Sequence, residues 1–280
     1  PTCWTLAEQC ELMLKRIRDA KDNLDSLANI ANWYAENGYR VDSAFRHYQT
    51  LLSQSSSDIL QIEEMTQVVH SNYRAFTEHI QKTYQEKFAE EGYGAMSIAS
   101  NLGFWNNYVK PLLDKKVVVL MADAFRYEMG KELEQSIVNH YDEVECIPSR
   151  AFVPTVTRFG MAALLPDAEN KMVLSMIDGH LQPVFDGEVI KIPDDRIAYI
   201  AKSTPSTVKV QDFNIKDFVL SKISSDTNLL IIRSVDTDAS GENLTGNGLS
   251  SMETELRSFA TKIRQCKNAG FDYFFVVADH

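Results

Sequence analysis

Residues 117–128 read VVVLMADAFRYE, and this stretch decides the fold class of the chain. Its first five residues form a continuous β-branched and apolar run, which is typical of a strand buried on both faces of a sheet. A helical pattern follows over about 125–139. Two similar runs, LLII at 229–232 and FFVV at 274–277, come later, and a helical pattern over about 249–269 precedes the second. Buried strands that alternate with helices predict an α/β fold, with a mostly parallel sheet and helices on both of its faces.

The residues before this stretch show helical periodicity instead. Apolar residues recur at steps of three, four and seven from Leu6 to Ile30, and a second long helical pattern runs over about 58–88. Asn37-Gly38 is a helix stop signal, after which Asp42 or Ser43 can cap the next helix. We therefore expect an all-helical N-terminal domain.

The alternation of predicted strands and helices, and the segment that interrupts it, predict the domain boundaries. The helical N-terminal domain covers residues 1–112 and the α/β core covers 113–280. Several turn-forming pairs between 167 and 227, such as Asp178-Gly179 and Asp186-Gly187, interrupt this alternation. We expect an inserted lobe over about 167–227.

Composition and charge exclude several classes of protein. Of the 280 residues, 44% are hydrophobic and 24% charged, which is ordinary for a globular protein. The net charge of −11 has the wrong sign for general electrostatic binding to duplex DNA or RNA. No apolar run approaches the roughly 18 residues that span a bilayer, and no targeting segment is visible. The four cysteines form no CxxC pair, which favours reduced thiols in a cytoplasmic protein. Both ends of the chain look like cuts rather than natural termini.

Acidic residues follow each of the three predicted strands. Asp123 follows the first, Asp236 and Asp238 follow the second, and Asp279 and His280 follow the third. Ligands of open parallel sheets bind at the carboxyl ends of the strands. Carboxylates with one imidazole suit a divalent cation there. The alternative is that these acids are helix caps and turn formers.

Thr157 adds a hydroxyl just before a predicted short helix over 158–165. A group at a helix N-terminus lies beside free backbone N–H groups, where a phosphate is stabilised. Close to a metal ion, the hydroxyl would lose its proton more easily and could attack phosphorus. The alternative is that Thr157 or Thr155 is only the N-cap of that helix.

Five segments in colinear order resemble the PglZ family. The stretch 117–128 is similar to its hydrophobic strand followed by D-A-x-R-Y-E, and VPTVTRFGMAALLP at 153–166 to its P-[ST]-x-T-x-x-G-M-A-[AS]-L-L-P segment. DASGE at 238–242 resembles I-D-A-x-G-D, and ADH at 278–280 resembles A-D-H-G. Residues 33–46 resemble the helical region that precedes the PglZ core. The first two motifs are long and specific, whereas DASGE and ADH alone would be weak.

The resemblance implies an alkaline-phosphatase-like fold with two divalent metal ions, Zn, Mn or Mg. One ion would be held by Asp123, Asp279 and His280, with Thr157 as nucleophile or direct ligand, and the second by Asp238 and Glu242. Two such cations can stabilise the attacking and leaving oxygens of a phosphoryl transfer. Arg126 is a candidate for neutralising phosphate charge. Its alternative role is structural, paired with Glu128 or Glu132.

Two departures from the family pattern affect the second ion. Glu242 stands where the PglZ pattern has Asp, and its longer side chain would shift the ion. Members of the wider superfamily also take a histidine ligand from beyond the DH motif, where this chain stops. We therefore expect a fragment with an incomplete second site, and inactivity of this piece stays open. His140 or His180 could substitute, although each also reads as an ordinary loop or surface histidine.

The resemblance implies a phosphodiesterase, nuclease or phosphatase within a bacterial phage-defence system of the BREX type. Expected partners are other BREX components, such as a PglX-type DNA methyltransferase, which the N-terminal helices could dock. The substrate would be a nucleic acid or another phosphate ester at the local metal site. One alternative is a catalytically silent scaffold. Another is a phosphomutase-like or sulfate-ester activity, since one fold hosts several reactions.

Overall fold

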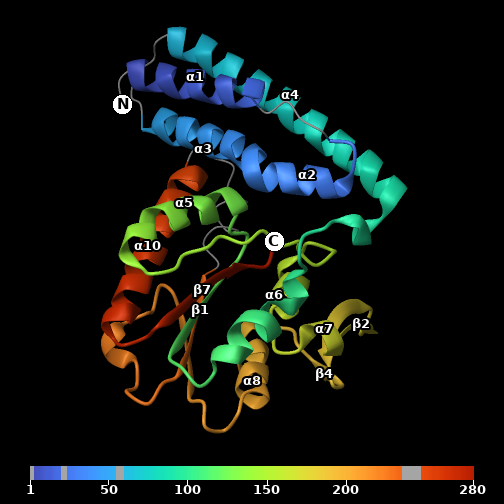
Figure 1. Cartoon of the computed structure of the whole chain (residues 1–280), viewed down its shortest axis with the longest axis vertical. Coiled ribbons are helices and arrows are strands. Elements are labelled where there is room, and N and C mark those ends of the chain that lie inside the picture. The colour runs from blue at the N-terminus through green and yellow to red at the C-terminus, as the bar shows by residue number, and fades with distance from the viewer. Residues whose placement is uncertain (1–2, 20–23, 55–59, 235–246) are drawn as a thin grey trace.

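The main sheet contains four parallel strands in the order β5-β6-β1-β7, in a computed structural model that describes residues 3–19, 24–54, 60–234 and 247–280. Its strands are β1 (Val117–Ala122), β5 (Val210–Asn214), β6 (Leu229–Ser234) and β7 (Tyr273–Ala278). All six residues of β1 are buried, because β1 has a strand on each side and helices on both faces (Figure 1). The three apolar runs of the sequence are therefore three strands of one sheet, as predicted.

Alternate residues of β1 face two separate hydrophobic cores. Val117, Val119 and Met121 pack in the core that includes α6 (Thr157–Ala163) and α8 (Pro193–Ser203). Val118 and Leu120 pack in the other core, with α5 (Tyr127–Ile137) and α10 (Asn247–Asn268). This alternation follows from the two-residue period of a strand. The predicted α/β class, with helices on both faces of a parallel sheet, is confirmed.

A small antiparallel sheet lies beside α6 and α8. After α7 (Ala168–Lys171), it is formed by β2 (Met172–Ile177), β3 (His180–Phe185) and β4 (Glu188–Val189). Asp178 and Gly179 both have positive φ, at 51° and 77°, as a two-residue hairpin turn requires. Phe185 packs on Tyr199 of α8 with ring centroids 4.7 Å apart, which fixes this sheet to the core. Of the range 167–227 expected as an inserted lobe, residues 210–214 are β5 of the main sheet.

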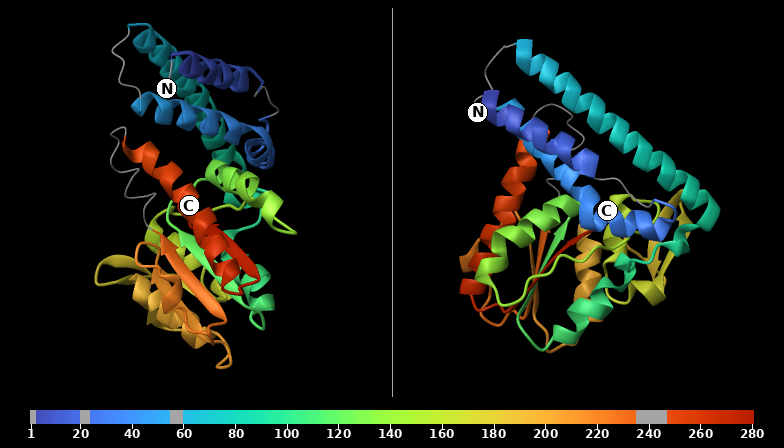
Figure 2. Two further views of the ribbon diagram at one scale, coloured as in Figure 1. Left: turned by 90° about the vertical axis from the view of Figure 1, so that its left-hand side faces the viewer. Right: turned by 45° about the horizontal axis from the view of Figure 1, so that its top comes forward.

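The N-terminal residues form a helical layer, in agreement with the periodicity. It consists of α1 (Cys3–Asp19), α2 (Leu27–Trp33), a π-helical turn (Tyr34–Gly38), α3 (Tyr39–Ser53) and the long α4 (Leu60–Glu91). Leu6, Met13, Tyr48 and Val69 form part of its own buried core. Two views in Figure 2 place this layer against the ends of α5 and α10, above the sheet. The helical layer therefore has a core of its own and a contact with the α/β part.

The prediction that a helix ends at Asn37-Gly38 is wrong. Gly38 has helical angles, φ −60° and ψ −38°, and the chain continues through the π-helical turn into α3. A Cβ at Gly38 would lie 2.9 Å from ring atoms of Trp33 and Tyr34, so the glycine makes room for packing rather than ending a helix. The expected capping role of Asp42 is also wrong, because its buried carboxylate accepts hydrogen bonds from the hydroxyls of Tyr34 and Tyr73.

Ser43 does not cap α3 either, since its hydroxyl donates to Glu132. The four cysteines are free thiols. In the ranges that the structure covers, we find no helix with the length and hydrophobicity needed to cross a bilayer. Short 3₁₀ or π turns also occur, at Tyr93–Ala95, Asn101–Gly103, Trp105–Val109, Lys110–Leu112, Val138–His140 and Leu220–Lys222.

Candidate functional site

The carboxyl ends of β1 and β7 bring three predicted site residues together. The two strands are neighbours in register, with Ala122 paired to Ala278. Asp123 follows β1 directly, and Asp279 and His280 follow β7. The backbone N–H of Asp123 donates to the carbonyl of Ser234 on β6, at 2.9 Å, which continues the ladder past the strand end. The side chains are thus placed by strand register rather than by a flexible loop.

These three side chains offer one compact set of ligand atoms. His280 Nε2 lies 3.6 Å from Asp123 Oδ1 and 3.7 Å from Asp279 Oδ2. One ligand atom from each residue lies within 4.8 Å of the other two. Asp123 and Asp279 are buried, at 3% and 1% exposure, while His280 is partly exposed. Two buried carboxylates and a partly exposed imidazole are a candidate cation site.

Asp279 is held by the backbone through one of its oxygens. Its Oδ1 accepts hydrogen bonds from the N–H groups of Ala124, at 3.1 Å, and His280, at 3.0 Å. Its buried Oδ2 has no hydrogen-bond partner and faces His280 Nε2. Burial raises the pKa of the Asp279 carboxyl, although the two backbone donors act in the opposite direction. A divalent cation at this oxygen would satisfy it and stabilise the charged form, so the residues present fit a metal ion.

Thr157 lies beside the same carboxylates. Its Oγ1 donates a hydrogen bond to Asp123 Oδ1 at 3.1 Å. Thr157 is the first residue of α6, while Val156 occupies the N-cap position without a side-chain cap bond. The hydroxyl is therefore directed at a candidate metal ligand rather than at the helix end, which was the alternative for this residue.

Gly160 allows α6 to approach the end of β7. A Cβ at this position would lie 2.9 Å from Asp279 Cβ and 3.0 Å from its carbonyl oxygen. Such distances are shorter than normal contacts, so only glycine fits without a shift. Asn101 Nδ2 donates a hydrogen bond to the same Asp279 carbonyl at 3.3 Å. Gly160 and Asn101 thus fix the position of Asp279, and sequence reasoning missed both.

Arg196 of α8 is a further charged residue that sequence reasoning missed. Its guanidinium interacts electrostatically with Asp279 and Asp123, and its buried Nε has no hydrogen-bond partner. Burial lowers the pKa of this guanidinium, while the two carboxylates act to raise it. Pro193-Asp194-Asp195, just before Arg196, is a sequence pattern typical of a helix N-terminus. Such a pattern does not reveal which part of the fold the helix packs against. The structure therefore adds one cation near the carboxylates.

The other predicted residues lie elsewhere or outside the described ranges. Asp238 and Glu242, expected to hold the second metal ion, lie outside the described residues, and so does Asp236, the other acid that follows the second predicted strand. His140 and His180 are exposed, and neither belongs to a metal-competent group among the residues that were placed.

Arg126 pairs with carboxylates as its structural alternative predicts. Its Nε lies 3.3 Å from Glu128 Oε1, and one terminal nitrogen lies 3.4 Å from Asp42 Oδ2. The partners are thus Glu128 and Asp42 rather than Glu132. The contribution of Arg126 to phosphate binding stays a prediction that these contacts do not support.

Comparisons with known proteins agree with the motifs. The chain matches the family described as "BREX system PglZ alkaline phosphatase-like domain" over residues 104–280. It is similar to the "Alkaline phosphatase-like protein BrxZ" of Escherichia coli O9:H4 (strain HS), with 27% identity over 146 residues, 48% of this chain and 17% of that protein. It is also similar to the "Alkaline phosphatase-like protein PglZ" of Bacillus cereus (strain H3081.97), with 24% identity over 151 residues, 48% of this chain and 16% of that protein. The chain thus spans about a sixth of the length of these relatives.

Proposed function

Because the chain belongs to the PglZ family of alkaline phosphatase-like domains from BREX systems, we propose that it provides the metal-dependent site of a phosphoric-ester hydrolase. The observation that carries the proposal is the hydrogen bond from Thr157 Oγ1 to Asp123 Oδ1, beside Asp279 and His280. A nucleophilic hydroxyl next to a cation site is the arrangement that phosphoryl transfer to a side chain requires.

Asp123, Asp279 and His280 would hold one divalent ion. The imidazole nitrogen favours Zn or Mn, and the carboxylates also admit Mg. When bound, the ion neutralises phosphoryl oxygens and favours ionisation of a nearby hydroxyl. Asp238 and Glu242 remain our candidates for a second ion.

Thr157 is the proposed nucleophile. Its Oγ1 forms a bond to phosphorus while the bond from phosphorus to the leaving alcohol oxygen breaks, and its proton leaves along the hydrogen bond to Asp123. The departing alkoxide takes a proton from water. A water molecule then attacks phosphorus, the bond to Oγ1 breaks, and Oγ1 regains its proton, which releases the phosphate product.

Arg196 is the proposed phosphate-binding cation of the site. Its guanidinium already interacts with Asp123 and Asp279, and its fork of N–H donors matches phosphate oxygens. Such a local cation would favour an anionic substrate at the site, against the negative net charge of the chain.

We place this activity in bacterial phage defence, in the cytoplasm, with other BREX components such as a PglX-type methyltransferase as partners. The family description supports a BREX setting. The substrate class is a phosphomonoester or phosphodiester, including nucleic acid that reaches the local site. The helical layer is the proposed surface for partner proteins.

A hydrolysis assay with divalent metal ions tests the proposal. We expect cleavage of p-nitrophenyl phosphate or bis(p-nitrophenyl) phosphate, whose relative rates separate a monoesterase from a diesterase. Thr157→Ala should lower kcat by at least about 10³-fold, because it removes the nucleophile, while Thr157→Ser keeps a hydroxyl and should retain activity. Binding of Mn²⁺ should persist in Thr157→Ala, since the three ligands remain.

Two outcomes would contradict this proposal. If Thr157→Ala and wild type hydrolyse the esters equally, Thr157 is not the nucleophile. If folded protein hydrolyses neither ester with any divalent ion, and Thr157→Ala leaves phage defence unchanged, the silent scaffold is the better description.

A further inference from the structure

Three helices meet where the helical layer contacts the α/β core. α3 of the layer packs against α5 and α10 of the core (Figure 1). Arg46 of α3 is buried at this junction, with 1% exposure, and pairs with Glu128, Glu132 and Glu253. One arginine thus lies among three glutamates that come from two other helices.

Negative charge exceeds positive charge in this group. Arg126 pairs with Glu128 and also with Asp42, so four carboxylates face the two guanidinium groups of Arg46 and Arg126. Arg257 lies further out, on the wall of an adjoining cavity. Arg257 offsets one of these charges, and a proton on the ring of His47 would offset another. A divalent cation bound in place of that proton would supply the same compensation.

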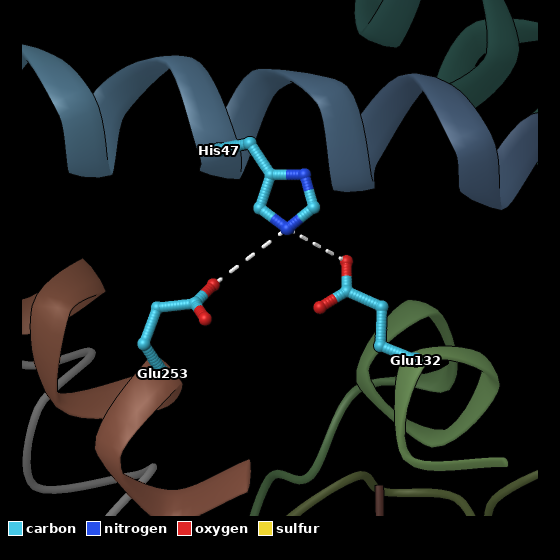
Figure 3. A group of neighbouring side chains, drawn as sticks. All are labelled: His47, Glu132 and Glu253. Atoms are coloured by element: carbon cyan, nitrogen blue, oxygen red, sulfur yellow. Dashed lines mark ion pairs between the residues drawn. The ribbon is translucent and has the colours of Figure 1, made fainter. Parts of the chain in front are cut away.

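His47, next to Arg46, directs its ring at two of these glutamates. Figure 3 shows its Nε2 pointing between Glu132 and Glu253, which approach from α5 and α10. Nε2 lies 3.1 Å from Glu132 Oε1 and 3.8 Å from Glu253 Oε1, and the three ligand atoms lie within 4.8 Å of one another. Adjacent ligands of an ion with bonds of about 2.1 Å lie about 3.0 to 3.4 Å apart. Movements of roughly 1 Å or less would therefore bring the three ligand atoms to these spacings around one ion.

The ion pairs with Arg46 leave lone-pair positions free on these carboxylates. Each ionised carboxylate has about four lone-pair positions on its two oxygens. Glu132 uses Oε2 for Arg46 and presents Oε1 to His47. Glu132 Oε1 also accepts a hydrogen bond from Ser43, and Glu253 uses Oε1 both for Arg46 and toward His47. Each of these two oxygens would therefore bind the ion through a remaining lone pair. Arg46 holds both glutamates in place from the buried side, as outer partners of metal ligands commonly do.

The opposite side of the cluster is open. A cavity of about 450 Å³ is lined by His47 and Glu253, together with Gln9 and Thr50. An ion can enter through it, and water can fill the remaining coordination positions.

We propose that His47, Glu132 and Glu253 bind a divalent transition-metal ion of the Zn²⁺ or Mn²⁺ class, which joins the helical layer to the core. An imidazole and two carboxylates favour such an ion over Mg²⁺ or Ca²⁺, which prefer oxygen ligands alone. This ion is separate from the one proposed at Asp123, Asp279 and His280. Its role is structural, because its three ligands come from three helices on both sides of the junction.

Cobalt titration of the whole chain tests this site, since Co²⁺ replaces Zn²⁺ and gives a visible spectrum. The starting protein carries Asp238→Asn, Asp279→Asn and His280→Ala, which removes the ions proposed for hydrolysis. We expect it to bind one Co²⁺ and to melt at a higher temperature with Co²⁺ or Zn²⁺. Adding His47→Ala should weaken binding by more than about tenfold, since even partners outside the ligand shell contribute about 10–100-fold.

His79→Ala provides the matched control, because His79 is an exposed histidine of the same helical layer. It should leave the spectrum and the metal-dependent rise in melting temperature unchanged. The proposal is overturned if His47→Ala binds Co²⁺ as tightly as the starting protein, or if the starting protein binds no Co²⁺. In either case the cluster is an ion-paired junction only.

Discussion

At the scale of single residues, Gly160 determines how closely α6 approaches Asp279. In Gly160→Ala the new Cβ would lie 2.9 Å from Asp279 Cβ and 3.2 Å from its Oδ2. We expect a loss of about 1–3 kcal/mol in unfolding free energy from this overpacking, and weaker Mn²⁺ binding because Asp279 is displaced. Urea denaturation and Mn²⁺ titration measure the two effects. Gly94→Ala is the control, since nothing lies within 4 Å of its added Cβ. Equal stability of the two variants would contradict the proposed packing.

The grouping of the strand-end residues was predictable from sequence, but the groups around them were not. Apolar runs mark buried parallel strands, and residues that follow neighbouring strands meet at one sheet edge, so Asp123 and Asp279 were expected together. The pattern around Thr157 left the N-cap alternative open, because only the contact with Asp123 separates the two roles. Asn101 acts on a backbone carbonyl 178 residues away, which no local pattern encodes.

At the scale of elements, α8, which packs on the small sheet through Tyr199, brings Arg196 near Asp279 and Asp123. We expect Arg196→Gln to raise KM for a phosphate ester by about tenfold or more, since a charged hydrogen bond contributes about 1.5–3 kcal/mol. Ester hydrolysis kinetics measure this. Lys202→Gln on the same helix is the control, because Lys202 is exposed and pairs with Glu188. An unchanged KM in Arg196→Gln would remove Arg196 from the substrate site.

Elements with strong periodicity were predicted, and those that depend on packing were not. β5 (Val210–Asn214) was missed because an edge strand that is only partly buried needs no apolar run, and its sequence is VQDFN. Asn37-Gly38 suggested a helix end because the sequence does not reveal the rings of Trp33 and Tyr34 against Gly38. Both errors arise where tertiary contacts override local preference.

At the scale of the whole molecule, Arg46 links the helical layer to the core across 82 residues to Glu128 and 207 residues to Glu253. Arg46→Ala would leave Glu128 buried, with 0% exposure, and weaken two further ion pairs. We expect a loss of about 3 kcal/mol, because Glu128 would keep only Arg126 as its cationic partner at a buried position. Urea denaturation with EDTA present measures this loss free of any contribution from bound metal.

Lys82→Ala separates this effect from the loss of an ordinary ion pair. Lys82 and Glu86 form an exposed pair at 4.0 Å on α4, and such pairs contribute little. The unfolding midpoint should therefore stay near that of wild type in Lys82→Ala and fall clearly in Arg46→Ala.

If the layer and the core unfold as one unit, probes in both should report the same midpoint in wild type. In Arg46→Ala the layer should then unfold at lower urea than the core, since the junction is weakened while each part keeps its own hydrophobic core. Coincident transitions in Arg46→Ala, with no loss of stability, would show that apolar packing alone holds the two parts together.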